Sequence, residues 1–467
     1  MKGGFPSRLR LLGVLAACAL TVAACGARWT DAQTKVLDRR DLAGAVGGTA
    51  TTVAGSSDAG SSAAASQAAG AAPSSSTGAA AALNAGPSAA AGGSPAAASS
   101  LPCAAHSTAP GVTDQLLTVG NVATISGPLP GLGATAQGSA VAYVAYLNSI
   151  GGVCGRHVKL LTADDGYDGS RARTIIADYA SKTLGLIAFF VPAGGAAADV
   201  IKSTNLPILG AIGDPLIRAE PSVFNENPPP PPTPAKKFAY LKSQGVRTAA
   251  LVTLSAAAAV TELDQHQAQM EAAGIKVVSR QILPVTTLSF DSAARVVANS
   301  GADYLFFLSA DSQDASMAQA MRDTGYKLKF EEYLTGYGSN FTKIAGAAAE
   351  GTSSWLRTLP IEEANTNAEA AKFVEWMGRT VPDTPTDVFA TDGWTSAKAF
   401  FDALQQLKSP ITRDALIAQL RTFTSYDAGG FLGRIDLAHG VSDGCLIGVR
   451  FESGQWKRIA PATGFLC

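Results

Sequence analysis

Two series of alternating strand and helix patterns constrain the fold of this chain more than any other feature. In the first, buried-strand patterns alternate with helical patterns at residues 116–125, 136–150, 158–163, 171–184, 186–191, 196–204 and 207–211. The second begins after five consecutive prolines at 228–232 and starts with a helix at 235–244. It continues with a strand at 248–254, a helix at 261–273, a strand at 276–280, a helix at 290–300, a strand at 304–308, a helix at 312–324 and a strand near Tyr333. Such alternation predicts parallel β-α-β units. Residues 103–467 also exceed the usual size of one core, so two similar α/β lobes are expected.

The N-terminus has the order of charged and apolar residues found in a secretory signal. Lys2, Arg8 and Arg10 precede an apolar run at 11–24 that is too short to span a bilayer, which needs about 20 apolar residues. The run ends in Val22-Ala23-Ala24-Cys25, which resembles the bacterial lipobox, whose cysteine is lipidated. We therefore expect a lipoprotein signal peptide at 1–24 and a lipid on Cys25. The alternative is an ordinary signal peptide that happens to end in cysteine.

A low-complexity stretch follows the signal. Residues 43–100 contain one charged side chain, Asp58, and no aromatic residue. Nearly all of the stretch is Ala, Gly, Ser, Thr and Pro, which buries too little apolar surface to offset the entropy lost on ordering. A disordered tether is therefore expected at 25–102, between the lipidated cysteine and the folded body. As a flexible coil it would reach about 45–50 Å, enough to hold the body clear of a lipid surface.

Four cysteines remain beyond the signal and the lipidation site. They are Cys103, Cys154, Cys445 and Cys467, and they allow three pairings. No two have C-x-x-C spacing, so a zinc site or thioredoxin-like chemistry is not expected, and an exported chain favours disulfides. Because each pair falls within one stretch of the chain, we predict Cys103–Cys154 and Cys445–Cys467.

Several functional classes lack their sequence motifs. A net charge of -1 gives no basic patch for nucleic acid. The chain has no H-E-x-x-H, no G-x-S-x-G and no phosphate-binding loop, and its four histidines are scattered. Gly131-x-Gly133-x-x-Ala136 matches a dinucleotide fingerprint formally, but a proline-containing loop separates it from the strand. We therefore expect no cofactor, no metal and no catalytic residue. The Asp164-Asp165 pair ends a strand and would either cap the next helix or face a cleft.

Several segments together resemble a known family, the substrate-binding proteins of branched-chain amino-acid ABC importers. They are Ser126-Gly127-Pro128, Leu147-Asn148-x-x-Gly151-Gly152-x-x-Gly155-Arg156, Asp164-Asp165, Ile344-Ala345-Gly346-x-Ala348-Ala349-Glu350-Gly351 and Thr391-Asp392-Gly393-Trp394. The resemblance spans about 350 residues and implies the type I periplasmic-binding fold, in which two Rossmann-like lobes joined by three crossings close on a ligand. It predicts a first lobe of 103–227 with 388–430 and a second of 228–387 with 431–467.

The loops that bind the ligand in this family are altered here. After the third and fourth strands the family has hydroxyl-bearing residues for the ligand carboxylate, but here the loops at 192–196 and 210–214 have mostly glycine and alanine. Tyr337 stands where an acidic residue would meet the ligand amine. An α-amino acid is therefore disfavoured, since its charges would be buried without partners. Backbone amides could still bind a carboxylate, and Tyr337, Phe224 and Leu132 could line an apolar pocket. The predicted ligand contacts are Ser126, Gly127, Gly194, Gly195, Ala211, Gly213, Ala310, Asp311 and Tyr337.

The resulting expectation is a monomeric receptor, lipid-anchored on the extracytoplasmic face of the cell membrane, that delivers a small organic solute to an ABC permease. No enzymatic activity is expected. The alternative is a surface sensor or interaction protein on the same scaffold.

Overall fold

The computed structural model describes residues 102–228 and 236–467, which all belong to one compact unit. The expected signal peptide, Cys25 and almost all of the tether at 25–102 lie outside the described residues, as do residues 229–235. Within the described ranges, no helix is long and apolar enough to cross a membrane.

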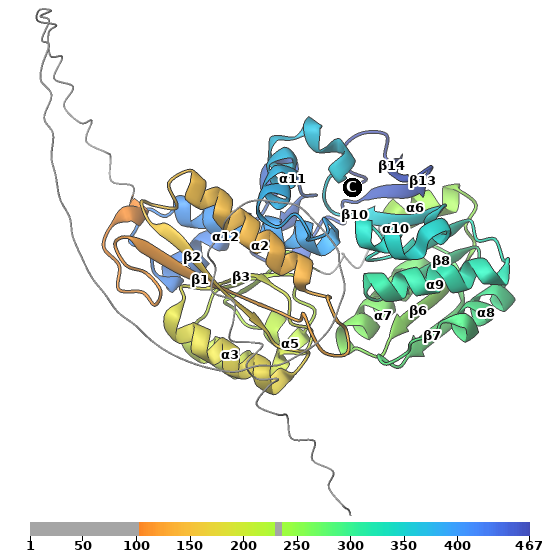
Figure 1. The fold of residues 1–467 in the computed structure, drawn as a ribbon, viewed down its shortest axis with the longest axis horizontal. Coiled ribbons are helices and arrows are strands. Elements are labelled where there is room, and N and C mark those ends of the chain that lie inside the picture. The colour runs from red at the N-terminus through yellow and green to blue at the C-terminus, as the bar shows by residue number, and fades with distance from the viewer. Residues whose placement is uncertain (1–101, 229–235) are drawn as a thin grey trace, which may run out of the picture. The chain divides into compact units, whose positions relative to one another are not determined.

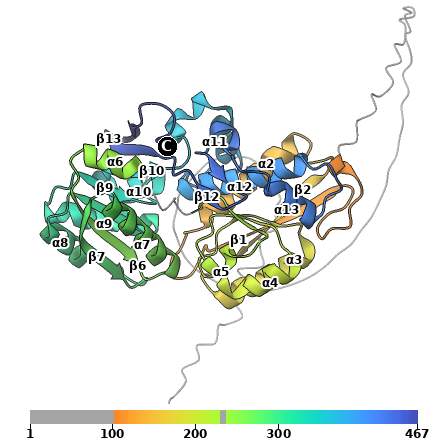
Figure 2. The same ribbon diagram turned by 180° about the vertical axis from the view of Figure 1, so that it is seen from behind.

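The first lobe is built on a five-stranded parallel sheet with the order β2-β1-β3-β4-β5 (Figure 1). The strands are β1 (Leu116–Ala123), β2 (His157–Asp164), β3 (Leu186–Phe189), β4 (Ile208–Gly210) and β5 (Val223–Asn225). Helices α3 (Gly169–Lys182), α4 (Ala198–Thr204) and α5 (Pro215–Arg218) cover one face, and α2 (Ala134–Ser149) and α12 (Val388–Gln405) cover the other (Figure 2). Because both faces are covered, β1 and β3 are buried almost throughout.

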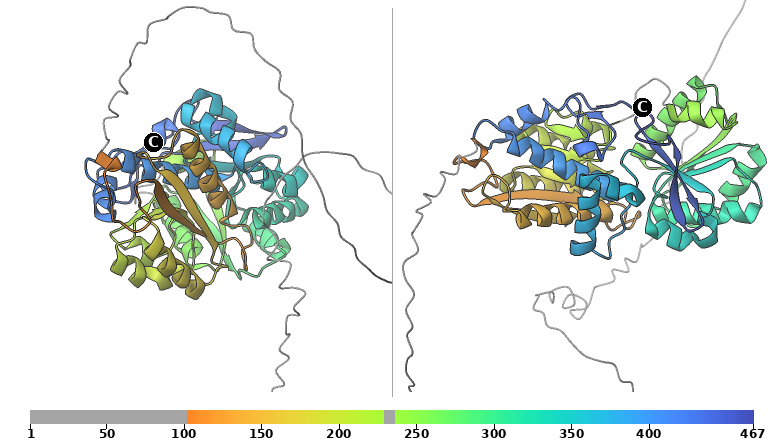
Figure 3. Two further views of the ribbon diagram at one scale, coloured as in Figure 1. Left: turned by 60° about the vertical axis from the view of Figure 1, so that its left-hand side comes forward. Right: turned by 90° about the horizontal axis from the view of Figure 1, so that it is seen from above.

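The second lobe is built on a seven-stranded sheet with the order β14-β13-β10-β9-β8-β6-β7. Its parallel strands are β6 (Thr248–Leu254), β7 (Lys276–Leu283), β8 (Tyr304–Leu308), β9 (Phe330–Tyr333) and β10 (Thr352–Leu356). The last two, β13 (Ile447–Glu452) and β14 (Gln455–Ala460), add in antiparallel fashion. Helices α6 (Lys236–Ser243), α7 (Ala257–Ala272), α8 (Asp291–Ser300), α9 (Asp311–Thr324) and α10 (Ser339–Ala345) flank this sheet (Figure 3).

The chain returns to the first lobe earlier than the expected boundary at 388. After β10 it runs through a short 3-10 turn into α11 (Ala368–Thr380), whose Phe373 and Met377 share one buried cluster with Tyr143 and Leu147 of α2. The family-like segment at 391–394 lies inside α12 and so does not itself form a crossing between the lobes. Phe431 and Leu432 belong to the same first-lobe cluster, together with helix α13 (Arg413–Leu420). The apolar faces of α11 and of the 431–437 segment are buried in the core of the first lobe, and both segments therefore belong to that lobe.

Both predicted disulfides, Cys103–Cys154 and Cys445–Cys467, are confirmed. The first is braced by Arg156, which is fully buried and donates hydrogen bonds to the carbonyl oxygens of Cys103 and Cys154 at 2.8 and 3.1 Å. These carbonyls and that of Thr113 satisfy a guanidinium that would otherwise be costly to bury. The Gly155-Arg156 pair of the family pattern therefore has a structural role here.

Candidate functional site

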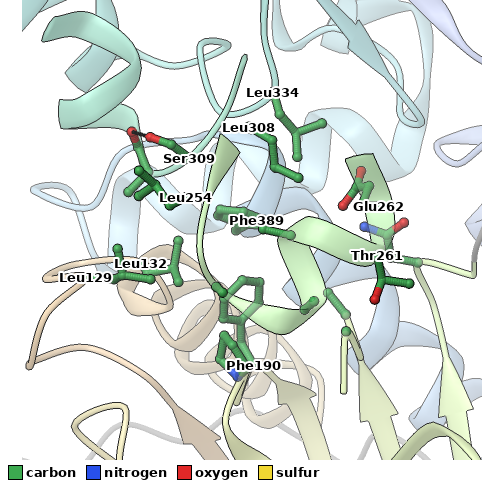
Figure 4. Close-up of a pocket in the computed structure, with 18 of the residues that line it drawn as sticks. Leu129, Leu132, Phe190, Leu254, Thr261, Glu262, Leu308, Ser309, Leu334 and Phe389 are labelled. Carbon is green, nitrogen blue, oxygen red and sulfur yellow. Dashed lines mark hydrogen bonds between the residues drawn. The ribbon is translucent and has the colours of Figure 1, made fainter. Parts of the chain in front are cut away.

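A cavity lies between the lobes, where the carboxyl ends of strands from both sheets face each other (Figure 4). We call it the apolar cavity, and it has a volume of about 180 Å³ accessible to water. Its lining is mostly hydrophobic and comes from three regions. The first lobe contributes Leu129, Leu132, Phe190, Pro192, Ala211, Ile212, Gly213, Arg218 and Asn227; the second contributes Leu254, Ala256, Ala258, Ala259, Thr261, Glu262, Gln265, Leu308, Ser309, Ala310 and Leu334; and α12 contributes Phe389.

Strand ends position this lining. Phe190 and Pro192 follow β3, Ala211 follows β4, and Ser309 follows β8. Binding outside the carboxyl ends of parallel strands is the general rule for open α/β sheets, because the loops there converge. Phe389, in the first turn of α12, packs edge-on against Phe190 with ring centroids 4.6 Å apart. These two rings form an aromatic wall of the cavity.

The predicted ligand contacts divide into three groups. Ala211, Gly213 and Ala310 line the apolar cavity. Asp311 lines an adjoining cavity of about 460 Å³, which also contains Asp383 and Asp387 and which we call the acidic cavity. The remaining predicted contacts line none of these spaces.

Ser126 and Gly127 form a tight turn instead of a cavity wall. The Ser126 hydroxyl donates to Asp164 Oδ2 at 2.5 Å, and the Ser126 amide donates to the other carboxylate oxygen. Gly127 has a φ of 96°, and a Cβ there would lie 2.3 Å from the Gly166 carbonyl oxygen, so only glycine fits. Burial would raise the pKa of Asp164, but hydrogen bonds from Ser126, Ile125 and Gly166 outweigh it and hold the pKa at about 2.

The Asp164-Asp165 pair therefore fixes the loop after β1 and does not cap the next helix. Asp165 accepts a hydrogen bond from Thr124 Oγ1 at 2.6 Å. The N-cap of α3 is Asp168, whose side chain accepts from the amides of Ser170 and Arg171. The alternative that Asp164-Asp165 caps the next helix was therefore wrong. The chain makes a turn between the end of β2 and the start of α3, so the cap falls at Asp168 instead.

Gly194 and Gly195 pack within the first lobe. A Cβ on Gly194 would lie 2.5 Å from Ile217 Cδ1. The Gly195 amide donates to Asp214 Oδ2 at 2.8 Å, and Asp214 also caps α5. The small residues at these positions let α5 approach the loop after β3, so they shape the cavity without lining it.

Tyr337 does not occupy the position that the sequence suggested. It is 2% exposed and lies in a core cluster of the second lobe, with its ring centroid 5.4 Å from that of Trp456. Its hydroxyl donates to Glu362 Oε2 and accepts from the Ile361 amide, both at 2.7 Å. Because the hydroxyl finds these partners away from the cavity, the ring turns inward. Phe224 is likewise core, and of the three suggested apolar residues only Leu132 lines the cavity.

A buried charge network lies near the apolar cavity and links the residues just after β5 and β10 to α12. Arg357, just after β10, donates to the Glu226 carbonyl at 2.8 Å and to Asp392 Oδ1 of α12 at 2.6 Å. Its contact with Glu226 Oε2 is longer, at 3.3 Å. Burial raises the pKa of Glu226 to about 8, with Asp392 adding to the rise.

A second buried pair lies behind the network. Lys237 Nζ contacts Glu332 Oε1 at 2.6 Å, and both side chains are at most 3% exposed. Burial lowers the pKa of Lys237, and Glu332 opposes this effect. Over the part of the chain that the structure describes, no group of three or more His, Cys, Asp or Glu side chains is placed to hold a metal ion.

Sequence reasoning missed the main walls of the site. Phe190 follows β3 directly, and a large residue at a strand's carboxyl end could have been singled out. Phe389 and the start of α7 could not have been identified from the sequence, because they reach the cavity only through the packing of the lobes. Alanines at 256, 258 and 259 leave room where larger side chains would fill the space.

Comparison with known proteins agrees with this architecture. A family model described as "Periplasmic binding protein" matches residues 117–455. A search of curated proteins found no match. Among solved structures, the fatty acid ABC transporter substrate-binding protein from Thermomonospora curvata is 18% identical with a TM-score of 0.66, covering 77% of this chain and 95% of that chain.

Two branched-chain amino-acid proteins are also similar. The transporter substrate-binding protein LivJ from Streptococcus pneumoniae, in complex with isoleucine, is 16% identical with a TM-score of 0.62, covering 74% of this chain and 100% of that chain. The leucine-binding protein LivK from Thermotoga maritima is 17% identical with a TM-score of 0.62, covering 74% of this chain and 98% of that chain. The expected resemblance and the two-lobed α/β fold are confirmed, and the chain belongs to the periplasmic binding protein family with the type I fold.

Proposed function

We propose that this protein is the substrate-binding component of an ABC importer and that it captures an apolar small molecule between its lobes. Membership of the periplasmic binding protein family supports ligand capture. The observation that carries the choice of ligand is the lining of the apolar cavity, where leucine, phenylalanine, alanine and proline side chains predominate. Burying apolar ligand surface there is favourable by roughly 25 cal/mol per Å².

The cavity fits an α-amino acid poorly. On the first-lobe side the lining offers Ala211, Ile212 and Gly213 where hydroxyl groups would be needed for a zwitterion. One similar structure is named for a ligand of another class, the fatty acid ABC transporter substrate-binding protein of Thermomonospora curvata, and its likeness to this chain is one of fold. An apolar ligand is therefore the class that we propose, in contact with Phe190, Phe389 and the predicted residues Ala211, Gly213 and Ala310.

The proposal includes how the protein is held and what it serves. We place a lipid on Cys25 and the folded body at the end of the tether, on the extracytoplasmic face of the cell membrane. There a monomeric receptor would pass its ligand to an ABC permease without chemical change. The lipobox-like sequence before Cys25 and the composition of residues 43–100 support this arrangement.

Calorimetry on the full chain tests the proposal, with straight-chain alcohols from hexanol to dodecanol and with leucine as ligands. We expect an alcohol to bind more tightly than leucine. Phe389→Ala should weaken that binding by about 1 kcal/mol or more, as truncation of a central aromatic usually does. The matched control is Phe423→Ala, because Phe423 stacks on Tyr426 in the first lobe and lines none of the cavities described above. Tight leucine binding that is insensitive to Phe389→Ala would refute the proposal.

A further inference from the structure

Arg218 is the one basic side chain in the lining of the apolar cavity, among the residues that the structure describes. It lies at the end of α5 and is half-buried. Its guanidinium makes no hydrogen bond or ion pair with any described residue, whereas those of Arg156, Arg357 and Arg413 each make three or more such contacts. A positive charge therefore stands at an apolar surface without a hydrogen-bond or ion-pair partner among the described residues.

The one acidic side chain of this lining, Glu262, is differently placed. It also lines a neighbouring polar cavity that contains Lys237 and Arg357. Burial raises the pKa of Glu262, and the positive charges of Arg357 and Lys237 act in the opposite direction. Glu262 thus lies near protein cations as well as near the carboxylates of Glu332 and Asp392, whereas no acidic described residue is paired with Arg218, so a ligand anion is directed to Arg218.

The acidic cavity limits where an anion can lie. It meets the apolar cavity at Leu132, Ala310 and Phe389, and it contains Asp311, Asp383 and Asp387 with no basic side chain among its described lining. Burial raises the pKa of Asp387 to about 7, and the charge of Asp311 adds to the rise. A negative ligand group is repelled there, and an alkyl chain is not.

We infer that the ligand is an amphipathic anion, an apolar chain or ring bearing one carboxylate, and that Arg218 binds the carboxylate. The inference rests on the proposed function, and it adds that the ligand of this same cavity carries a negative charge. Guanidinium and carboxylate form two parallel charge-assisted hydrogen bonds, which are stronger in a partly desolvated site than in water. The apolar part then lies against Phe190, Phe389 and the leucines.

Calorimetry with three matched series tests this inference: carboxylates, alcohols and amines of equal chain length, from six to twelve carbons. We expect the best carboxylate to bind the full chain at least tenfold more tightly than the alcohol of the same length. Arg218→Gln should remove that advantage, a loss of about tenfold or more, and leave the alcohol unchanged. The control is Arg295→Gln on α8, because Arg295 is exposed, makes no contact with an acidic described residue and lies outside the cavity.

The outcomes separate the inference from the function beneath it. If alcohols bind as tightly as carboxylates and Arg218→Gln changes neither, the apolar site stands and the anionic ligand is refuted. Amines that bind most tightly would refute it too, in favour of the aspartates. If no series binds, the proposed apolar site fails and the inference with it. Arg218→Lys keeps the charge but not the paired hydrogen bonds, so intermediate carboxylate affinity is expected, with an unfolding temperature equal to that of the parent.

Discussion

Replacing Glu226 by glutamine should stabilise this protein at neutral pH, although it removes a member of a buried ion network. Glu226 is fully buried, and its Oε1 accepts a hydrogen bond from Thr395 Oγ1 at 2.6 Å. Its Oε2 is 3.3 Å from Arg357, while Asp392 holds the same guanidinium at 2.6 Å. One cation thus faces two carboxylates, and Asp392 is the better placed of the two. Glu226 is accordingly the group that retains its proton.

The size of the effect follows from the pKa of Glu226, which burial raises from 4.5 to about 8. The stability that Glu226 contributes in its protonated form is fully present below pH 4.5, and it is lost as the pH rises through 8. At 1.36 kcal/mol per pKa unit, the full loss is about 5 kcal/mol, of which about 3 kcal/mol has occurred by pH 7. A glutamine does not ionise in the unfolded chain and so avoids this loss.

Glutamine can also keep the hydrogen bonds. Its oxygen would accept from Arg357, and its amide nitrogen would donate to Thr395 Oγ1. The Thr395 hydroxyl would then donate to the Thr391 carbonyl, which lies 2.9 Å away. Each hydrogen bond that the Glu226 side chain makes thus has a counterpart in the glutamine variant, so the cost of the replacement should be small.

The assay is urea unfolding of the parent and Glu226→Gln between pH 5 and 8. We expect the variant to be more stable by less than about 1 kcal/mol at pH 5 and by up to about 3 kcal/mol at pH 7. The comparison cancels the contributions of other buried carboxyls such as Asp314 and Asp387, which are unchanged. Glu220→Gln is the control, because no side-chain hydrogen bond joins Glu220 to a described residue. A variant that is less stable at pH 7, with an unchanged pH slope, would show that Glu226 is ionised and paired.

Three other predictions concern the cleft, the disulfides and the anchor. Gly213→Val should weaken ligand binding measured by calorimetry, because even a Cβ at 213 would lie 2.9 Å from Ala258 Cβ in the other lobe. The unfolding temperature should change little, and an affinity equal to that of the parent would contradict this prediction. Cys103→Ser with Cys154→Ser should lower the free energy of unfolding by roughly 2–4 kcal/mol in urea, and a loss below 1 kcal/mol would count against the disulfide as a stabiliser. Cys25→Ser should abolish labelling by a fatty-acid analogue and release the protein to the medium, whereas equal labelling would disprove the anchor.

Local sequence patterns determined the fold class and most of the elements. β6 (Thr248–Leu254) and β8 (Tyr304–Leu308) have the expected bounds, because each is a short apolar run buried on both faces. The disulfides could be predicted as well, since both pairings join segments that adjoin within one lobe. Helix starts were less accurate: α7 begins at Ala257, four residues before the expected 261, because alanine has high helix propensity but no periodic pattern.

Only the tertiary structure decided which side chains face the cleft. Tyr337 follows a strand end, as an anchor should, yet its hydroxyl finds Glu362 and the ring turns into the core. The place of α11 in the first lobe likewise depends on burying Phe373 against α2, a contact between distant segments. Strand and helix patterns depend on neighbours within a few residues and are visible in the sequence. A cavity depends on the packing of loops from both lobes, so the roles of Arg218 and Phe389 became apparent only once the lobes were in place.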